Sequence, residues 1–260
     1  MSVGTRARTF AALLLLSVPT ALHAQVNIER LRLTGADTSL AGMAGADFSA
    51  RTGNVSLVLL DLTGRVDYGR RRWATFLLGR NEFGWQGGKR FSNQGLLHLR
   101  FGYHFTRVVT GEAFVQTDYD KSRLLSFRVI TGAGPRFTLA RTGGWRVALG
   151  SAFMLEHEQY DLPPTAVHPR RIDDSRWSNY LSLSYGEGDG GRVALALTGY
   201  AQPRITDFGN LRMLGDLTFA VRIVHALALT VSSNVRYDSR PPDGIESLDT
   251  ATKTGLAVSW

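Results

Sequence analysis

Few residues of this chain have the types and spacing of a catalytic site. His157 and Asn179 lie on one face of two segments that we expect to be neighbouring β-strands, and a serine beside them would complete a hydrolytic triad. Ser151 shares the face of His157, but six residues of extended chain separate them by roughly 20 Å. A nucleophile must touch its base, so no catalytic residue is predicted, and a surface hydrolase is the least favoured alternative.

Acidic residues near strand ends could bind a metal ion, because carboxylates are the ligands that calcium prefers. Four aspartates would have to gather at one rim: Asp118, Asp120, Asp173 and Asp174. Their spacing matches no metal-binding loop, so we expect solvated carboxylates, no metal site and no cofactor. His98 and His104 are expected to be polar residues of an inner wall rather than ligands.

Two basic pairs, Lys89-Arg90 and Arg170-Arg171, fall in long connections between the expected strands. Guanidinium groups match the geometry of phosphates. On the outer side of a bacterial outer membrane, these pairs could therefore contact lipopolysaccharide. Solvated loops of the same composition are the alternative, and the residues alone leave both open.

The segments that would position these residues read as β-strands, because apolar and polar residues alternate along them. The expected strands are 43–51, 56–68, 72–83, 96–105, 108–120, 124–139, 145–158, 176–185, 192–202, 211–221, 226–238 and 249–260. The fourth is the clearest: Leu97, Leu99 and Phe101 take one face, and His98 and Arg100 take the other. No helix and no linker to a second domain is expected.

The charged residues follow the same alternation. In each expected strand the more apolar face holds no Asp, Glu, Lys or Arg, whereas the other face holds a nearly balanced set of both signs. A lipid-facing wall explains this, because a charge at mid-membrane costs about 2–4 kcal/mol. The pattern predicts an all-β fold, an antiparallel transmembrane β-barrel of 12 strands; a soluble β-sandwich is the alternative.

The connections between the expected strands alternate in length. Short ones such as Thr106-Arg107 follow the even-numbered strands, and longer ones at 84–95, 159–175 and 203–210 follow odd-numbered strands. Outer-membrane barrels have short periplasmic turns and longer outer loops. Both termini are therefore expected in the periplasm.

The N-terminus resembles a secretory signal. Arg6 and Arg8 precede an apolar run at 10–18, and Ala21 and Ala24 supply small residues before a cleavage site. The expected organisation is a signal peptide at 1–24, a periplasmic lead at 25–41 and an outer-membrane barrel at 42–260. The final strand ends on Trp260, an aromatic end that barrel-assembly machinery would receive, or a residue of the interfacial girdle.

Composition restricts the partners. The chain of 260 residues has no cysteine, which excludes disulfides and thiolate chemistry. Its formal net charge of +8 could suggest nucleic acid. Export by a signal peptide makes that partner improbable, so we expect outer-membrane lipid, lipopolysaccharide and the assembly machinery, in a Gram-negative-type bacterium. The sequence does not predict an oligomeric state.

The segment 112–139 carries a family resemblance. Its features are Phe114, Gln116, Tyr119-Asp120, Leu125, Arg128, Gly132, Gly134 and Arg136, joined by Thr52-Gly53-Asn54 in an early turn and by Tyr237-Asp238, Pro241-Pro242, Gly244 and Asp249 near the end. In this order they resemble the salt-induced outer-membrane protein family, whose defining β-barrel domain has no assigned function. The resemblance implies an outer-membrane barrel, a possible stress response and no catalytic residues. The connection at 159–175 fits it less well.

The inward charges leave two main hypotheses for function. The first is a small, weakly selective pore. The second is a closed structural barrel whose inward charges pair and fill the interior. The charges expected to face one another across the interior are Arg100, Arg128 and Arg136 on one side and Asp61, Glu112 and Asp216 on the other.

Overall fold

The computed structural model describes residues 39–53, 56–186, 192–224 and 227–258. They form one antiparallel sheet of 12 strands in which each strand pairs with its neighbours in chain order. The strands are β1 (Ser39–Arg51), β2 (Leu57–Arg70), β3 (Trp73–Gln86), β4 (Lys89–His104), β5 (Val109–Asp120), β6 (Leu125–Thr142), β7 (Trp145–Tyr160), β8 (Arg171–Gly186), β9 (Val193–Arg204), β10 (Asp207–Val224), β11 (Leu227–Asp238) and β12 (Leu248–Val258).

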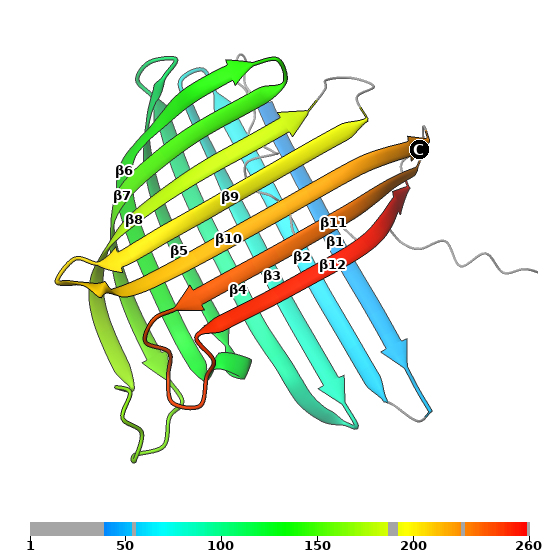
Figure 1. The fold of residues 1–260 in the computed structure, drawn as a ribbon, viewed down its shortest axis with the longest axis vertical. Coiled ribbons are helices and arrows are strands. Elements are labelled where there is room, and N and C mark those ends of the chain that lie inside the picture. Colours follow the sequence, from blue (N-terminus) through cyan, green and yellow to red (C-terminus); the bar gives the residue numbers. More distant parts are fainter. Residues whose placement is uncertain (1–38, 54–55, 187–191, 225–226, 259–260) are drawn as a thin grey trace, which may run out of the picture.

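The sheet curls round on itself into a barrel (Figure 1), with β2 to β5 forming a wall opposite β9 to β12. Side chains from all strands between β2 and β11 line one common internal cavity, which shows that the polar face of the sheet encloses a lumen. The series of paired strands ends at β1 and β12, and no pairing joins these two strands within the described residues. The predicted all-β architecture with 12 antiparallel strands is confirmed.

The two faces of the wall differ as the alternation predicts. In β4, Leu97, Leu99 and Phe101 keep 43–48% of their surface exposed on the outside, whereas His98 and Arg100 on the inside are 4% and 7% exposed. Every buried charged residue of the described chain lies on the inward face. Outward-facing charges occur at the strand ends, beyond the apolar belt, where they can reach water.

The connection expected at 84–95 is not a loop. β3 runs to Gln86 and β4 starts at Lys89, so a two-residue turn of Gly87 and Gly88 joins them. These glycines have φ values of 56° and 78°, the left-handed backbone that a tight hairpin turn needs. Lys89 and Arg90 are therefore strand residues at a hairpin tip, and placing them in a loop was wrong.

Other boundaries also shift. β9 and β10 are joined by a turn of Ile205 and Thr206 instead of the longer connection expected at 203–210. β8 starts at Arg171 rather than at 176, which leaves a loop at 161–170. Although no helix was expected, Lys121–Arg123 form a single 3-10 turn, in which Ser122 donates from its backbone N–H to Asp120 Oδ1 at 3.1 Å.

β1 starts at Ser39, four residues before its expected start, and β12 ends at Val258. The signal peptide, most of the periplasmic lead and Trp260 lie outside the described residues. Within the described residues, no helix has the length and apolar character to cross a membrane.

The outward face provides a test of the barrel. Leu149 is 42% exposed near the middle of the apolar stretch of β7, paired with Phe137 and Leu181. Leu149→Arg should lower the free energy of unfolding by about 2–4 kcal/mol, because the charge would enter lipid. The measurement is urea unfolding in lipid vesicles. Val167→Arg, in the loop and 92% exposed, is the control and should have little effect. Equal effects of the two substitutions would refute the assignment of this face to lipid.

Candidate functional site: charged groups inside the barrel

Seven charged side chains form a continuous buried group near the long-loop end of the lumen. This lumen network consists of Asp118, Arg128, Glu156, Glu158, Arg176, Arg212 and Asp238. Its members come from β5, β6, β7, β8, β10 and β11, and their mutual ion pairs show that these inward positions lie close together in the lumen. The network has three arginines and four carboxylates, so the two signs nearly cancel.

Arg212 is the centre of the lumen network. Its guanidinium donates to Glu156 at 2.6 Å, to both oxygens of Glu158 at 2.8 Å and, through Nε, to Asp238 at 2.8 Å. β8 and β9 separate its own strand, β10, from β7, so the bonds to Glu156 and Glu158 span the interior, whereas Asp238 is the directly paired residue on neighbouring β11. Charge-assisted and bidentate bonds of this kind are the strongest type of protein hydrogen bond.

The other two arginines tie further strands to the same carboxylates. Arg176 donates through Nε to Glu156 Oε2 at 2.7 Å and through Nη2 to the Asn210 side chain at 3.1 Å. Arg128 donates to Asp118 at 3.0 Å and lies 3.6 Å from Glu156. The side chains of Glu156 and Arg176 are each 1% exposed, so bulk water has almost no access to them.

A second polar group lies nearer mid-barrel. Tyr180 on β8 donates its hydroxyl to Glu112 Oε2 on β5 at 2.7 Å, and Arg136 Nη1 on β6 lies 3.5 Å from that hydroxyl. Arg100 Nη1 approaches the same carboxylate at 3.7 Å. We call these four residues the Glu112 group. The Tyr180–Glu112 bond again connects strands that are not neighbours.

Two glycines make room for the large inward side chains. A Cβ at Gly150 would overlap the ring of Tyr180, and one at Gly132 would lie 2.5 Å from the ring of Phe114. Any larger residue at Gly150 would displace the tyrosine that bonds Glu112.

His98 is held in a stack of rings on the inner wall. Phe76 lies 5.5 Å from the His98 ring and Phe114 lies 6.2 Å from it, both stacked. Gln116 donates to Asp118 at 2.6 Å and so presents its amide oxygen to His98 Nδ1 at 3.0 Å. The proton of the ring is therefore assigned to Nδ1. His98 is an inward wall residue, as predicted.

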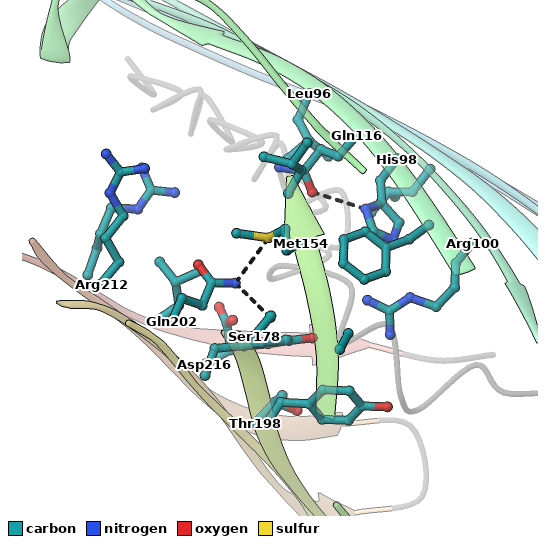
Figure 2. A pocket seen from close by; sticks show the side chains of 18 of the residues that line it. Leu96, His98, Arg100, Gln116, Met154, Ser178, Thr198, Gln202, Arg212 and Asp216 are labelled. Atoms are coloured by element: carbon teal, nitrogen blue, oxygen red, sulfur yellow. Dashed lines mark hydrogen bonds between the residues drawn. The ribbon is translucent and has the colours of Figure 1, made fainter. Parts of the chain in front are cut away.

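The lumen network and the Glu112 group border a cavity of about 300 Å³. Figure 2 shows Met154 between two walls, with His98, Arg100 and Gln116 on one side and Ser178, Gln202 and Asp216 on the other. Gln202 donates to Ser178 at 3.0 Å. The cavity combines an apolar base with amide, hydroxyl and charged groups, so it can hold water or a small polar solute.

The inward charges expected to face one another lie in different pairs. Arg100 and Glu112 do approach each other, at 3.7 Å, but they lie on neighbouring strands. Asp61 instead accepts from Arg80 at 2.7 Å, Asp216 accepts from Asn234 at 2.5 Å, and Arg128 belongs to the lumen network. Sequence position does not determine such cross-lumen partners, because they depend on how far each strand is staggered around the barrel.

The aspartates considered as metal ligands have separate partners. Asp118 binds Arg128, Asp120 accepts from Ser122, and Asp174 pairs with Arg204 across β8 and β9. Asp173 lies beside His157. Among the described residues, no three His, Cys, Asp or Glu side chains come close enough together to hold a metal ion.

The candidate hydrolytic residues lie on the outer face and are engaged separately. His157 Nδ1 lies 2.6 Å from Asp173 Oδ1, and Gln159 contacts its other nitrogen at 3.0 Å. Ser151 Oγ accepts from the indole of Trp177 at 2.7 Å. Asn179 donates to the backbone carbonyl of Trp177. The structure therefore brings an Asp–His pair together at the rim but gives it no serine among these residues.

The basic pairs considered for lipopolysaccharide lie at the long-loop end. Lys89, Arg90, Arg170 and Arg171 are all exposed. The guanidinium of Arg90 lies 5.0 Å from the ring centroid of Trp85 and 5.8 Å from that of Phe83. These aromatic contacts hold Arg90 beside the outward aromatic residues of β3.

Sequence reasoning did not single out Glu158, Arg176, Arg212 or Tyr180 among the many inward residues. A usable signal existed in Glu156 and Glu158, which share the inward face close to the end of one strand. Two such carboxylates require basic partners when buried. Which arginines supply the charge became evident only from the curved sheet.

The sequence also matches a known protein family. A family described as "Protein of unknown function, DUF481" matches residues 44–260. The chain belongs to this family. No curated protein matches the sequence of this DUF481 protein. The family match spans the barrel from within β1 to the final residue, including every member of the lumen network.

Solved structures with similar folds include two bacterial proteins. One is a NanC porin in a rhombohedral crystal form, with 9% identity and a TM-score of 0.47, covering 85% of this chain and 100% of the porin. The other is the translocator domain of the autotransporter NalP from Neisseria meningitidis, with 10% identity and a TM-score of 0.43, covering 89% of this chain and 91% of the domain. Both scores lie below 0.5, so these likenesses carry no functional inference.

The lumen network predicts that removing a positive charge and removing a negative charge destabilise the barrel by different amounts. Arg212→Met leaves Glu156, Glu158 and Asp238 buried with too little positive charge and should destabilise the barrel by about 3–5 kcal/mol. Glu158→Gln should cost less, because it leaves three arginines and three carboxylates. Urea unfolding in vesicles measures both. Arg240→Met breaks an exposed pair with Asp207 and should cost at most about 1 kcal/mol. An Arg212→Met effect no larger than that of Arg240→Met would contradict the network's role.

Proposed function

We propose that this protein is an outer-membrane barrel whose lumen is held closed by the lumen network. The main support for this proposal is that the carboxylate side chains of Glu156 and Glu158 are only 1% exposed inside the barrel. Charges that line a water-filled channel keep contact with water. Here the arginines have replaced that water with direct bonds across the interior, which supports a closed structural barrel over a constitutively open pore.

A narrow passage beside β2 and β3 is the second candidate, and it corresponds to a small, weakly selective pore. Arg80 and Asp61 on this side retain 28% and 22% of their side-chain surface, far more than the members of the lumen network. Asp216 and Arg236 line the cavity on the opposite wall. The two signs balance along this route, so it would give little preference for cations or anions.

The cellular setting is part of the proposal. The signal-like segment at 1–24 supports export, and the apolar outer belt supports insertion in the outer membrane with the short turns in the periplasm. Lys89, Arg90, Arg170 and Arg171 would then face lipopolysaccharide phosphates. We assign no enzymatic activity, and the aromatic end at Trp260 would serve recognition by the assembly machinery.

A stress-related role is supported by the resemblance to salt-induced outer-membrane proteins and by the burial of the charges. Salt screens exposed ion pairs strongly, but desolvated pairs such as Arg176–Glu156 are screened much less. A barrel closed in this way would stay closed when external ionic strength rises.

Single-channel recording on the purified protein in planar bilayers tests closure. We expect no steps, or small steps with weak ion selectivity, at both low and high potassium chloride. Arg212→Ala should increase the size or frequency of openings, because it removes the bonds that span the lumen. Arg240→Ala, at an exposed pair, should leave the recordings unchanged. A large, strongly selective conductance of the wild-type protein would overturn the closed-barrel proposal.

A further inference from the structure

Exposed arginines gather at the end of the barrel that carries the short turns. This arginine ring consists of Arg70, Arg71 and Arg72 in the β2–β3 hairpin, Arg107 after β4, Arg141 and Arg146 in the β6–β7 hairpin, Arg192 before β9, and Arg222 near the end of β10. All eight are exposed. The whole chain has 30 basic and 22 acidic residues, so the ring equals the entire excess of positive charge.

No Asp or Glu lies in the described turns that carry Arg70, Arg71, Arg72 and Arg107. The segments 69–73, 105–109, 140–146 and 222–224 contain no Asp or Glu. The turn before β9 does include Glu187 and Asp189, which lie outside the described residues. At the opposite end the signs are mixed: Lys89, Arg170, Arg171 and Arg240 occur with Asp161, Asp207, Asp243 and Glu246. Positive charge is thus concentrated on one rim.

Outward aromatic residues form a girdle directly beside the arginine ring. Trp73 pairs with Arg70 across the hairpin and contacts Tyr68 at a ring distance of 5.2 Å. Trp145 contacts Tyr185 at 4.7 Å on the outward face of β7, whereas the next residue, Arg146, lies on the inward face with Ala148 and Met154. Tryptophan and tyrosine concentrate at the level of lipid headgroups. The girdle therefore places the β2–β3 hairpin and its arginines at headgroup height.

The backbone at Arg71 supports a role for this side chain. Its φ is 51°, in the left-handed region that glycine or asparagine adopts most readily. The equivalent hairpin at the opposite end uses Gly87 and Gly88 for its left-handed positions. An arginine at such a position carries a conformational cost that its charged side chain must offset elsewhere.

We propose that four arginines of the ring, Arg70, Arg71 and Arg72 in the β2–β3 hairpin and Arg107 in the neighbouring β4–β5 turn, bind the phosphate groups of anionic phospholipids in the membrane leaflet at the short-turn end. The inference rests on the membrane placement in the proposed function, which puts this end at the periplasmic leaflet. Arginine donates two parallel hydrogen bonds to a phosphate, and several arginines around a rim engage several headgroups at once. The adjacent aromatic girdle favours a lipid over a soluble anion, because it holds the acyl region next to the bound phosphate.

The test compares matched variants of the full barrel in zwitterionic detergent. Phosphatidylglycerol is titrated in, and bound lipid is counted by native mass spectrometry. R70Q/R71Q/R72Q/R107Q should bind it at least about ten-fold more weakly than wild type, since each basic residue near an anionic surface contributes roughly five-fold. K89Q/R90Q/R170Q/R171Q removes the same charge from the other end and should stay within about two-fold of wild type. Heat-modifiability on a cold gel checks folding.

Three outcomes would overturn the proposal. Equal losses of lipid binding in the two quadruple variants would show that only total charge matters. Unchanged binding in R70Q/R71Q/R72Q/R107Q would remove the ring from lipid recognition. Displacement of the lipid by millimolar inorganic phosphate would identify a site for phosphate alone. Conductance plays no part in this readout, so its result is independent of whether the lumen is closed.

Discussion

A charged side chain inside this barrel has neither bulk water nor a tolerant lipid phase around it, so another side chain of the same wall must neutralise it. Burying an ion without a partner costs several kcal/mol, and a marginally stable barrel cannot lose that much folding free energy. Arg212 meets this constraint by binding Glu156, Glu158 and Asp238 at once. Its position fixes the relation between β7, β10 and β11, and the closed part of the lumen follows from it.

The constraint also explains why the two faces of each strand are so different. Outward positions must be apolar, because nothing there can neutralise a charge in lipid. Inward positions can be charged if the curvature of the sheet brings opposite signs together. The glycine at 150 contributes by letting Tyr180 lie flat against the wall and reach Glu112 on a distant strand. The polar core of this barrel thus takes the place that an apolar core has in a soluble protein.

The wall was predictable from the sequence, whereas the partners inside it were not. Alternation along 96–105 gave the correct faces for Leu99 and Arg100, because side-chain direction depends only on local strand geometry. The hairpin at Gly87-Gly88 was missed because glycines and polar residues in 84–95 resemble a loop when their turn geometry is unknown. The bond between Arg212 and Glu158 depends on strand stagger across the barrel, which alternation does not determine.

The exposed charges at the rim of the barrel are arranged differently from the charges inside the lumen. Within the lumen network the signs nearly cancel, while the described turns that carry Arg70 to Arg72 and Arg107 contain no carboxylate. The same residue type is therefore used in two ways in this DUF481 protein. Buried arginines bind carboxylates across the interior, and we propose that the exposed arginines of these turns bind lipid phosphates.

Measuring whether water-soluble reagents reach the lumen centre tests the central claim that the interior is closed. The chain has no cysteine, so a single one can be introduced at Met154, whose exposure is 1%, and separately at the exposed loop position Val167. In the folded protein, a charged water-soluble thiol reagent should modify Met154→Cys on the order of a hundred-fold more slowly than Val167→Cys. Comparable rates at the two positions would mean that water and solutes fill the barrel, and would contradict the account.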